Sequence, residues 1–374
     1  MTTSNTTRSA FRRAQPDQSG FTLVEVMVGL VIGMLATLVV MQLFSVFEKQ
    51  KRTTTGASDS LTNGNIALYR LKHDVQSAGF PLISLGAGYT PFLCAEPPSI
   101  GAIPAAAGVV TGISPITIVN GTSDTVTIRY GDAPMGGVPT LIKNIAGSMA
   151  TLQESSFGCT PGDITLVMNG AACGMSVAAA VGPSSSSVSG TVTLADPTNA
   201  AVGGTLACLG VWHEITYSVV NNATGGTLVR QDLGAFPNIG VEPLVADIVN
   251  MQAQYGVSAA GLTNTSPNFN QISEWVDATG PWAAPLSVAN RNRIKAVRIA
   301  IVARDAQNEN VNITDPCSST SAAAPTGLCA WAGNASSPAP TIDLSADSNW
   351  QKYRYRVFES IIPLRNVIWA KPYM

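Results

Sequence analysis

The chain has 374 residues, of which 12% are charged and 45% are hydrophobic, with 34 Gly and 23 Pro. This length is enough for one large domain or two modest ones, and the weakly charged, turn-rich composition favours β structure over a helical bundle. The formal net charge of −2 provides no basic footprint, so the composition gives no support for direct binding to nucleic acid.

The N-terminal part of the chain has the layout of an export signal. Residues 1–19 are polar and carry Arg8, Arg12 and Arg13 against a single acid, Asp17, and such positive charge keeps that end in the cytoplasm. From Val26 to Phe47 the chain has 22 residues without a charge. A helix of that length measures about 33 Å, enough to cross a hydrocarbon core of about 30 Å.

Glu25 is the one acid at the start of this apolar segment, and three interpretations of the segment treat it differently. A cleaved secretory signal requires an apolar region of about 7 to 15 residues and a small-x-small cleavage site, whereas this segment is longer and ends in QLFSVFEKQ. A plain signal anchor fits the length but does not explain Glu25, because a carboxylate inside the hydrocarbon is costly. On physical grounds alone, Glu25 is either functional or reaches the membrane interface.

The third interpretation comes from the stretch GFTLVE, residues 20–25, which resembles the processing site of type IV prepilins. The resemblance implies cleavage after Gly20 by a prepilin peptidase, N-methylation of the new terminus Phe21, and a role for Glu25 in assembly. Cleavage creates an α-amino cation on Phe21, and in a filament the amine of a neighbouring subunit can neutralise the buried carboxylate of Glu25. We therefore expect Glu25 to penalise subunits that assemble out of register.

A helical pattern continues beyond the membrane segment. Apolar or small residues recur at steps of three and four, whereas charged residues such as Arg70 and Asp74 fall largely on the other side. The recurring positions are Leu61, Gly64, Leu68, Leu71, Val75 and Ala78. Gly79 and Pro81 end the pattern. We expect one helix from about 22 to 78, loosened around 53–58, whose second half packs against a globular domain.

Residues 81–240 are rich in Gly, Pro, Ser and Thr and contain short alternating segments typical of antiparallel strands and hairpins. These segments are SPITIVNG, SDTVTIRYG, DITLVMNG, SGTVTLAD and HEITYSVV. Residues 181–190, VGPSSSSVSG, are expected to form an exposed loop. This middle region resembles no family that can be named.

The sequence changes character after residue 240. EPLVADIVNMQAQYGV places Leu244, Ile248 and Met251 at helical spacing and predicts a helix that ends at Tyr255. NRIKAVRIAIVARD predicts a strand that alternates apolar residues with arginines. A cysteine-bearing loop over 308–349 leads to a last strand, YRYRVFESIIPLRNVIW.

Three stretches of this region, DIVNMQAQYGV, KAVRIAIVARD and RVFESIIPLRNVIW, resemble the C-terminal half of the PilW family of minor pilins over about 241–369. Arg365 and Asn366, which follow Pro363, resemble a recurrent element of that family's C-terminus. We expect them to hold the last strand in place, with a binding role as the alternative.

Six cysteines, an even number without a C-x-x-C pair, indicate disulfide bonds and an oxidising compartment. Short separations favour the local pairs Cys317–Cys329 and Cys159–Cys173, each worth about 3 kcal/mol in the chain-entropy model. Cys94 and Cys208 would then pair by elimination. This is one of 15 possible connectivities, and buried free thiols are the alternative.

Residue patterns for catalysis are weak. The two histidines, His73 and His213, lack metal-ligand spacing, and Tyr217 stands where an H-E-x-x-H motif would need its second histidine. No P-loop, G-x-S-x-G or S-x-x-K motif occurs. We therefore expect no catalytic residues, no metal, no cofactor and no enzymatic activity.

The predicted fold class is α+β: a long N-terminal helix on an antiparallel sheet, pilin-like, with a large β-rich, loop-rich insertion. The predicted segments are a leader (1–20), a transmembrane and assembly helix (21–47), its amphipathic second half (48–80), a β-rich variable region (81–240) and a PilW-like C-terminal region (241–374).

The resemblance implies a minor pilin of a type IV pilus that helps to initiate assembly. The large size of the subunit predicts a position at the tip, together with other minor pilins. Its expected partners are other minor and major pilins, prepilin peptidase, the assembly machinery and the inner membrane. Before assembly its globular part would face the periplasm; afterwards it would support twitching motility or adhesion. The alternatives are a minor pseudopilin of a type II secretion system and a tip adhesin that binds a surface receptor.

Overall fold

The structure is a computed structural model that describes residues 20–82, 89–101, 110–156, 158–183, 189–222, 225–234 and 239–370. The expected leader, apart from Gly20, and the centre of the expected loop at 181–190 lie outside the described residues. The chain forms two compact units, Met1–Thr55 and Gly56–Met374, and each is described by itself. The class is α+β, with a long apolar helix followed by a β-rich domain.

Helix α1 runs from Leu23 to Ser77, as predicted, and is regular through the segment where loosening was expected. There the hydroxyls of Thr53 and Thr54 donate to the carbonyl oxygens of Lys49 and Gln50, one turn earlier. Such bonds keep polar side chains satisfied within a helix.

The second half of α1 buries one narrow face, but its members differ from the predicted stripe. Leu61 is 40% exposed and Leu68 is only half-buried. The buried positions are mostly small residues: Gly56, Ser60, Gly64, Ala67, Leu71 and Val75. A Cβ atom on Gly64 would lie within 2.0 Å of the Phe358 ring, so the helix approaches the sheet too closely for a larger residue at this point.

Five antiparallel strands form the first sheet, in the order β12-β11-β10-β3-β2. They are β2 (Ile116–Val119), β3 (Thr125–Gly131), β10 (Trp212–Asn222), β11 (Gly225–Asp232) and β12 (Ile239–Ala246). β2, β3 and β10 contain stretches that the alternating pattern predicted. Their apolar side chains share one core cluster with Ala67, Leu71 and Val75 of α1.

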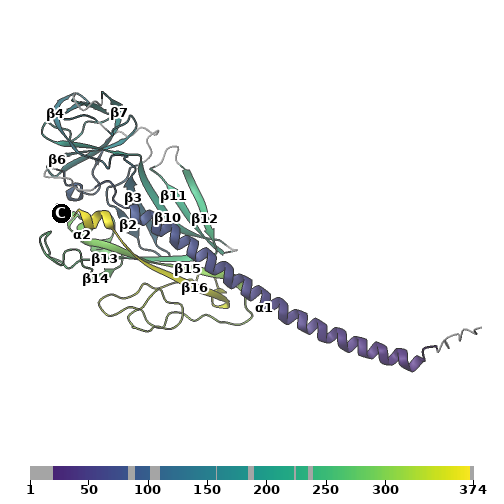
Figure 1. Cartoon of the computed structure of the whole chain (residues 1–374). Helices are drawn as coiled ribbons and strands as arrows, with labels where there is room; N and C mark the ends of the chain where they lie inside the picture. The colour runs from purple at the N-terminus through teal and green to yellow at the C-terminus, as the bar shows by residue number, and fades with distance from the viewer. Residues whose placement is uncertain are drawn as a thin grey trace, which may run out of the picture. The chain divides into compact units, whose positions relative to one another are not determined.

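A six-stranded barrel is inserted between β3 and β10 (Figure 1, top of the view). Each strand pairs with the next in the order β7-β6-β9-β4-β5-β8, and β8 pairs again with β7, which closes the ring. The strands are β4 (Thr140–Ala146), β5 (Met149–Leu152), β6 (Ile164–Asn169), β7 (Ala172–Val181), β8 (Thr191–Leu194) and β9 (Thr205–Gly210). The barrel has its own core, and β1 (Ser99–Ile100) joins β7 in parallel.

The C-terminal sheet has the order β14-β13-β15-β16 (Figure 1). Its strands are β13 (Ile248–Val257), β14 (Glu274–Val276), β15 (Ile294–Asn308) and β16 (Tyr353–Pro363). Val297, Ile299 and Ile301 of β15 belong to the core that includes α1, as the alternation predicted. On the opposite face, Ala300 and Val302 pack against residues of the 309–349 loop. Short helical turns complete the chain: η1 (Pro91–Leu93), η3 (Gly280–Trp282), α2 (Val288–Arg293), η4 (Trp350–Lys352) and α3 (Arg365–Trp369).

The predicted helix over 244–255 is wrong, because this segment forms the end of β12 and nearly all of β13. A β-bulge between Ile248 and Asn250 adds one residue to β13. Ile248 and Met251, three residues apart, therefore both reach the core that includes α1. Their spacing imitates a helix, although the backbone is extended.

The last predicted strand is correct only as far as Pro363, since Arg365–Trp369 form helix α3. This turn brings the Asn366 side chain to the end of α1, where its Nδ2 donates to the Ala78 carbonyl oxygen at 2.9 Å. Asn366 thus has a structural role, but it satisfies a carbonyl at the C-terminus of α1 rather than holding the last strand as expected.

All six cysteines form disulfides, but two of the three expected pairs are wrong. Cys317–Cys329 is confirmed, whereas Cys94 pairs with Cys173 and Cys159 pairs with Cys208. Cys173 belongs to the same core as Cys94, while Cys159 and Cys208 lie in the barrel core. Cys159 and Cys173 are close in sequence, but they lie in different cores and each has a nearer partner.

Candidate assembly site

The start of α1 presents the residues that the prepilin resemblance selected. Gly20, Phe21 and Thr22 precede the helix, and all three are exposed. The backbone N–H of Glu25 donates to Thr22 Oγ1 at 3.3 Å, and the N–H of Val26 donates to the Thr22 carbonyl oxygen at 3.2 Å. Thr22 is therefore the N-cap of the helix, and Glu25 stands in its first turn.

Sequence reasoning missed the part played by Thr22. The spacing Thr22-x-x-Glu25 is that of a capping box, in which the hydroxyl of the first residue satisfies an N–H of the first turn. That signal was available in the sequence. It fixes where the helix begins, two residues after the expected cleavage point, and a carboxylate there also interacts favourably with the helix dipole.

The Glu25 carboxylate is exposed, and within the described part of the chain its side chain makes no hydrogen bond or ion pair. A group in this state is open to a cation supplied from outside the chain. Phe21 is 82% exposed, so its backbone nitrogen is accessible in the same way. The structure thus brings together at one helix end all three residues predicted from the prepilin pattern.

The helix behind this site is apolar on every side. All side chains from Phe21 to Arg52 are exposed, including the large hydrophobic residues of the 26–47 segment. The helix is long and apolar enough to cross a membrane. Because burying a large apolar side chain is worth about 1.5–3 kcal/mol, such a surface requires a membrane or other helices around it.

The globular unit holds the second half of α1 through a polar contact that the sequence did not predict. Asp74 was assigned to the outer side of the helix, yet its carboxylate accepts a hydrogen bond from Tyr217 Oη at 2.8 Å and pairs with Arg230 Nε at 3.3 Å. Burial raises the pKa of Tyr217, which keeps its hydroxyl protonated as a donor. This contact joins α1 to β10 and β11.

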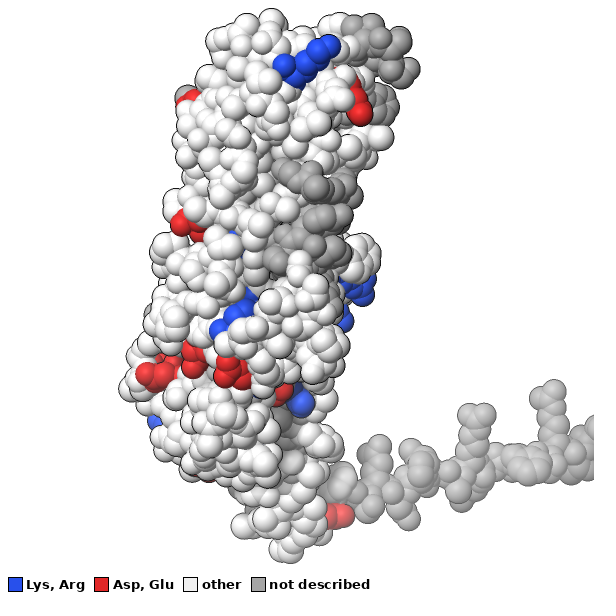
Figure 2. Space-filling model, turned by 90° about the vertical axis from the view of Figure 1, so that its left-hand side faces the viewer, with Lys and Arg blue, Asp and Glu red and all other residues white. Residues whose placement is uncertain are grey.

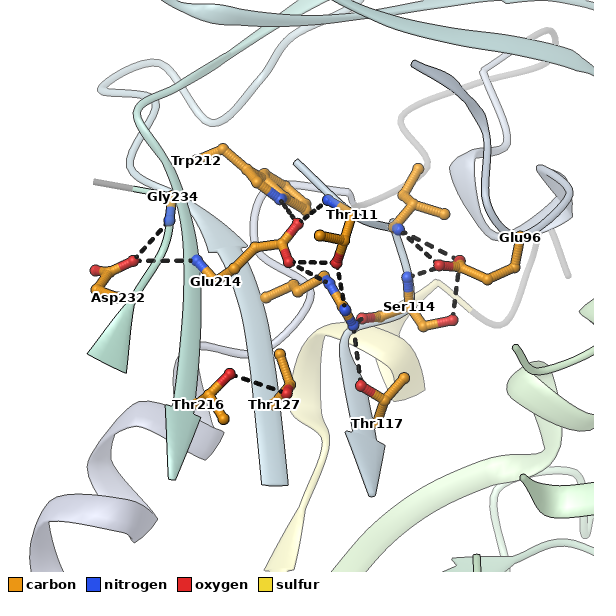
Figure 3. A network of polar contacts seen from close by, with 12 residues as sticks. Glu96, Thr111, Ser114, Thr117, Thr127, Trp212, Glu214, Thr216, Asp232 and Gly234 are labelled. Atoms are coloured by element: carbon orange, nitrogen blue, oxygen red, sulfur yellow. Dashed lines mark hydrogen bonds and ion pairs between the residues drawn. The ribbon is translucent and has the colours of Figure 1, made fainter. Parts of the chain in front are cut away.

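A buried charge network lies between the first sheet and the segments that lead to the barrel (Figure 3). Glu214 on β10 accepts hydrogen bonds from the Thr111 backbone N–H and hydroxyl, and it lies 3.2 Å from Arg129 Nε. Arg129 Nη1 donates to Thr117 Oγ1 at 3.1 Å. A buried pair supported by several hydrogen bonds fixes geometry rather than adding much stability.

A second buried pair ties the same region to the C-terminal sheet. Glu96 accepts from the backbone N–H groups of Ile113 and Ser114 and pairs with Arg291 Nη1 at 3.2 Å. Arg291 Nη2 donates to the carbonyl oxygen of Cys94, whose sulfur is bonded to the barrel. These contacts are structural, and they hold the barrel against both sheets.

Asp124, in the turn between β2 and β3, connects the first sheet to β13. Its Oδ2 accepts from the Ala253 N–H at 2.8 Å, and its Oδ1 accepts from the Gly121 N–H at 3.0 Å. Burial raises the pKa of Asp124 to about 6, and the two backbone hydrogen bonds offset part of that increase.

Each of the two histidines lies beside an aspartate. His213 Nδ1 is 2.7 Å from Asp232 Oδ2, and its ring stacks on Tyr130 with centroids 4.8 Å apart. Glu214 points to the other face of β10, as adjacent strand residues do, and joins the network of Arg129. His73 lies beside Asp74 on α1. Among the described residues no group of three or more His, Cys, Asp or Glu side chains could hold a metal.

Charged side chains are sparse on the face shown in Figure 2. Few lie toward the top of the view, where Figure 1 places the barrel, and acidic and basic residues gather lower down. The face has no continuous basic area of the kind that nucleic acid would require.

Two protein families match parts of the chain. Residues 15–41 match the prokaryotic N-terminal methylation motif, and residues 216–366 match the type IV pilus-assembly protein W family, PilW. No curated protein and no solved structure matches it. The first match contains Gly20, Phe21 and Glu25, and the second extends from β10 to α3, so the barrel lies outside both. Together the two matches are those of a PilW-family pilin with a prepilin-type N-terminal signal.

Proposed function

We propose that this chain is a minor pilin that helps to initiate assembly of a type IV pilus. In this proposal a prepilin peptidase cleaves after Gly20, Phe21 becomes the methylated N-terminus, and α1 holds the subunit in the inner membrane with its globular unit in the periplasm. The observation that carries the proposal is the apolar helix, exposed on every side, directly behind a methylation motif. Such a helix needs partners that the chain itself does not supply.

Glu25 acts in this proposal as the residue that selects the register of a neighbouring subunit. Its carboxylate makes no side-chain contact among the described residues, and it lies in the first turn of α1. In the low dielectric of packed apolar helices an uncompensated carboxylate is costly, whereas one paired with a terminal amine is not. Only the position that brings a cation to Glu25 removes this cost.

A place at the tip is supported by the size of the globular unit. The closed barrel, inserted in the chain between β3 and β10, adds six strands to those of the two sheets. A subunit within a filament has to fit between its neighbours, whereas a terminal subunit escapes that restriction. The partners in this proposal are other minor and major pilins and the inner-membrane assembly machinery.

The test compares two variants expressed in place of the native chain. Glu25→Ala should leave cleavage after Gly20 intact but reduce the amount of chain in purified pili about tenfold or more, because a desolvated ion pair is lost. Gly20→Val should block processing and leave a longer precursor in the membrane. Precursor length is read by mass spectrometry, and incorporation by immunoblotting of sheared pili.

Normal incorporation of the Glu25→Ala chain would contradict the pairing. Deletion of the gene separates the pilus from a type II secretion role, since loss of surface pili with normal secreted enzymes supports the former. The PilW match favours the pilus.

A tip adhesin remains the second candidate, and the barrel favours it. The barrel lies outside both family matches, and it exposes apolar residues on its outer surface, including Leu141 and Val202. Pili that assemble normally but lose surface attachment after Leu141→Ser and Val202→Ser would support this role.

A further inference from the structure

The outer edge of β16 is an open pairing surface in the described part of the molecule. β16 is the last strand of the C-terminal sheet and pairs only with β15. Its register is uninterrupted from Ala296↔Pro363 to Arg304↔Tyr355. Among the described residues, no backbone hydrogen bond reaches the other side of residues 354–363. A strand edge in this state presents a row of N–H and C=O groups to any extended chain.

The other sheet edges are interrupted or contacted along their length. In the first sheet, β12 contains Pro243 and pairs with two register shifts, both of which disrupt further pairing. At β2 the backbone N–H of Ile118 donates to the Tyr255 hydroxyl of the neighbouring sheet. At β14 the backbone N–H of Trp275 donates to Ser337 Oγ at 3.0 Å. The barrel closes on itself. In β16 the proline is the last residue, Pro363, and the register shift lies beyond Tyr355, so residues 355–362 keep a regular edge.

Side chains along β16 specify what kind of strand would fit. Phe358 and Ile362 face the core that includes α1, so Arg354 and Arg356, in phase with them, lie on that side of the sheet. Both arginines are exposed, and the ion pair of Arg354 with Glu309, at 3.2 Å, involves a partly exposed acid. On the opposite side, Ile361 is 60% exposed. A complementary strand has acidic residues beside the arginines and an apolar residue beside Ile361.

We propose that β16 is the docking edge for an extended segment of another pilin subunit, which continues the C-terminal sheet by one strand. Backbone hydrogen bonds supply the affinity in this mode of recognition, and the alternating side chains supply the choice of partner. The inference rests on the proposed function, because the partner is a subunit of the same pilus. It adds an interface in the globular unit to the one that Glu25 provides in the helix.

The first test places a photo-crosslinking amino acid at Arg356 in the full-length chain, expressed at its native level in its own host. The matched control carries the same residue at Val241 on β12, which is 56% exposed. The expected result is an adduct between position 356 and a strand of another processed pilin, identified by peptide mass spectrometry, without the same adduct from position 241. No adduct, or an adduct with a protein that is not a pilin, overturns the inference.

The second test reverses the charges with Arg354→Glu and Arg356→Glu together, and separately changes Ile361→Lys. Each should lower incorporation into pili about tenfold, because like charges or a buried ammonium would oppose the added strand. Glu242→Lys on β12 is the control and should incorporate normally. These positions are exposed, so the substitutions should not disturb the core. Unchanged disulfides and unchanged protease resistance check that the variants fold.

The outcomes also separate this inference from the proposed function. If the Gly20→Val and Glu25→Ala chains fail to assemble as expected while all β16 variants incorporate normally, the docking edge is wrong and the pilin role stands. If pili form without the chain and the chain is not processed, the pilin role itself fails.

Discussion

The two halves of α1 belong to one helix but differ in what covers their apolar surface. Residues 26–47 are apolar around the whole circumference and are exposed in the single chain. Residues 56–77 carry polar side chains on most sides and bury one face built largely from Gly, Ser and Ala. The first half therefore needs partners from outside the chain, whereas the second half packs on its own domain. The more hydrophobic half is therefore not the half that packs in the core of the globular unit.

Glycines in the two halves provide the largest expected contrast. Gly64→Leu should lower the free energy of unfolding of the globular unit by about 3 kcal/mol, because the new side chain overlaps the Phe358 ring. Gly33→Leu is the matched control, since nothing lies within 4 Å of a Cβ atom at that position. Denaturant unfolding of the detergent-solubilised chain, followed by tryptophan fluorescence, measures both. Equal stability of the two variants would break the distinction between the halves.

Between about pH 4 and pH 6, the pH dependence of the free energy of unfolding should arise in the globular unit. The pKa of Asp124 is about 6 in the folded chain against 3.8 ordinarily, so between these values the folded state binds more protons than the unfolded state. The free energy of unfolding should therefore fall by up to about 3 kcal/mol as the pH rises from about 4 to about 6.

The variant Asp124→Asn cannot ionise and should remove most of this slope. Unfolding curves at a series of pH values check it, with the helical circular dichroism of the membrane half expected to stay constant. A slope that is unchanged in the variant would assign the effect to another group.

A smaller effect is expected at the polar contact of the second half of α1. Asp74→Asn should cost about 2 kcal/mol, because the charge-assisted bonds to Tyr217 and Arg230 become neutral or are lost. Asp59→Asn, at an exposed position of the same helix, serves as the control and should change stability little. Thermal unfolding of both variants measures the difference, and similar melting temperatures would show that Asp74 does not anchor the helix.

Local sequence patterns predicted the helices and strands in which apolar and polar residues alternate with a regular period. The long helix and the alternating strands around Ile116–Val119 and Ile164–Asn169 follow directly from periodicity. The start of the assembly site was also predictable, because GFTLVE is contiguous in sequence.

Features that depend on distant segments were not predictable in this way. The bulge beside Ile248 gives a strand the spacing of a helix, and only its pairing with β15 reveals it. Cys159 and Cys173 are neighbours in sequence but contribute to different cores. Leu61 was expected inside on the basis of its hydrophobicity, yet the close approach of the helix to the sheet reserves that face for small residues.

The position of the barrel has a consequence for how such a chain can diversify. The polypeptide leaves the first sheet after Gly131 and returns at Trp212, and these two residues are paired neighbours on β3 and β10. Departure and return at a single point mean that the sheet constrains neither the length nor the topology of what lies between them. A related gene could exchange this module for another one in a single recombination event, with loss of the Cys94–Cys173 disulfide, while the helix, the PilW-like region and the edge of β16 stayed the same.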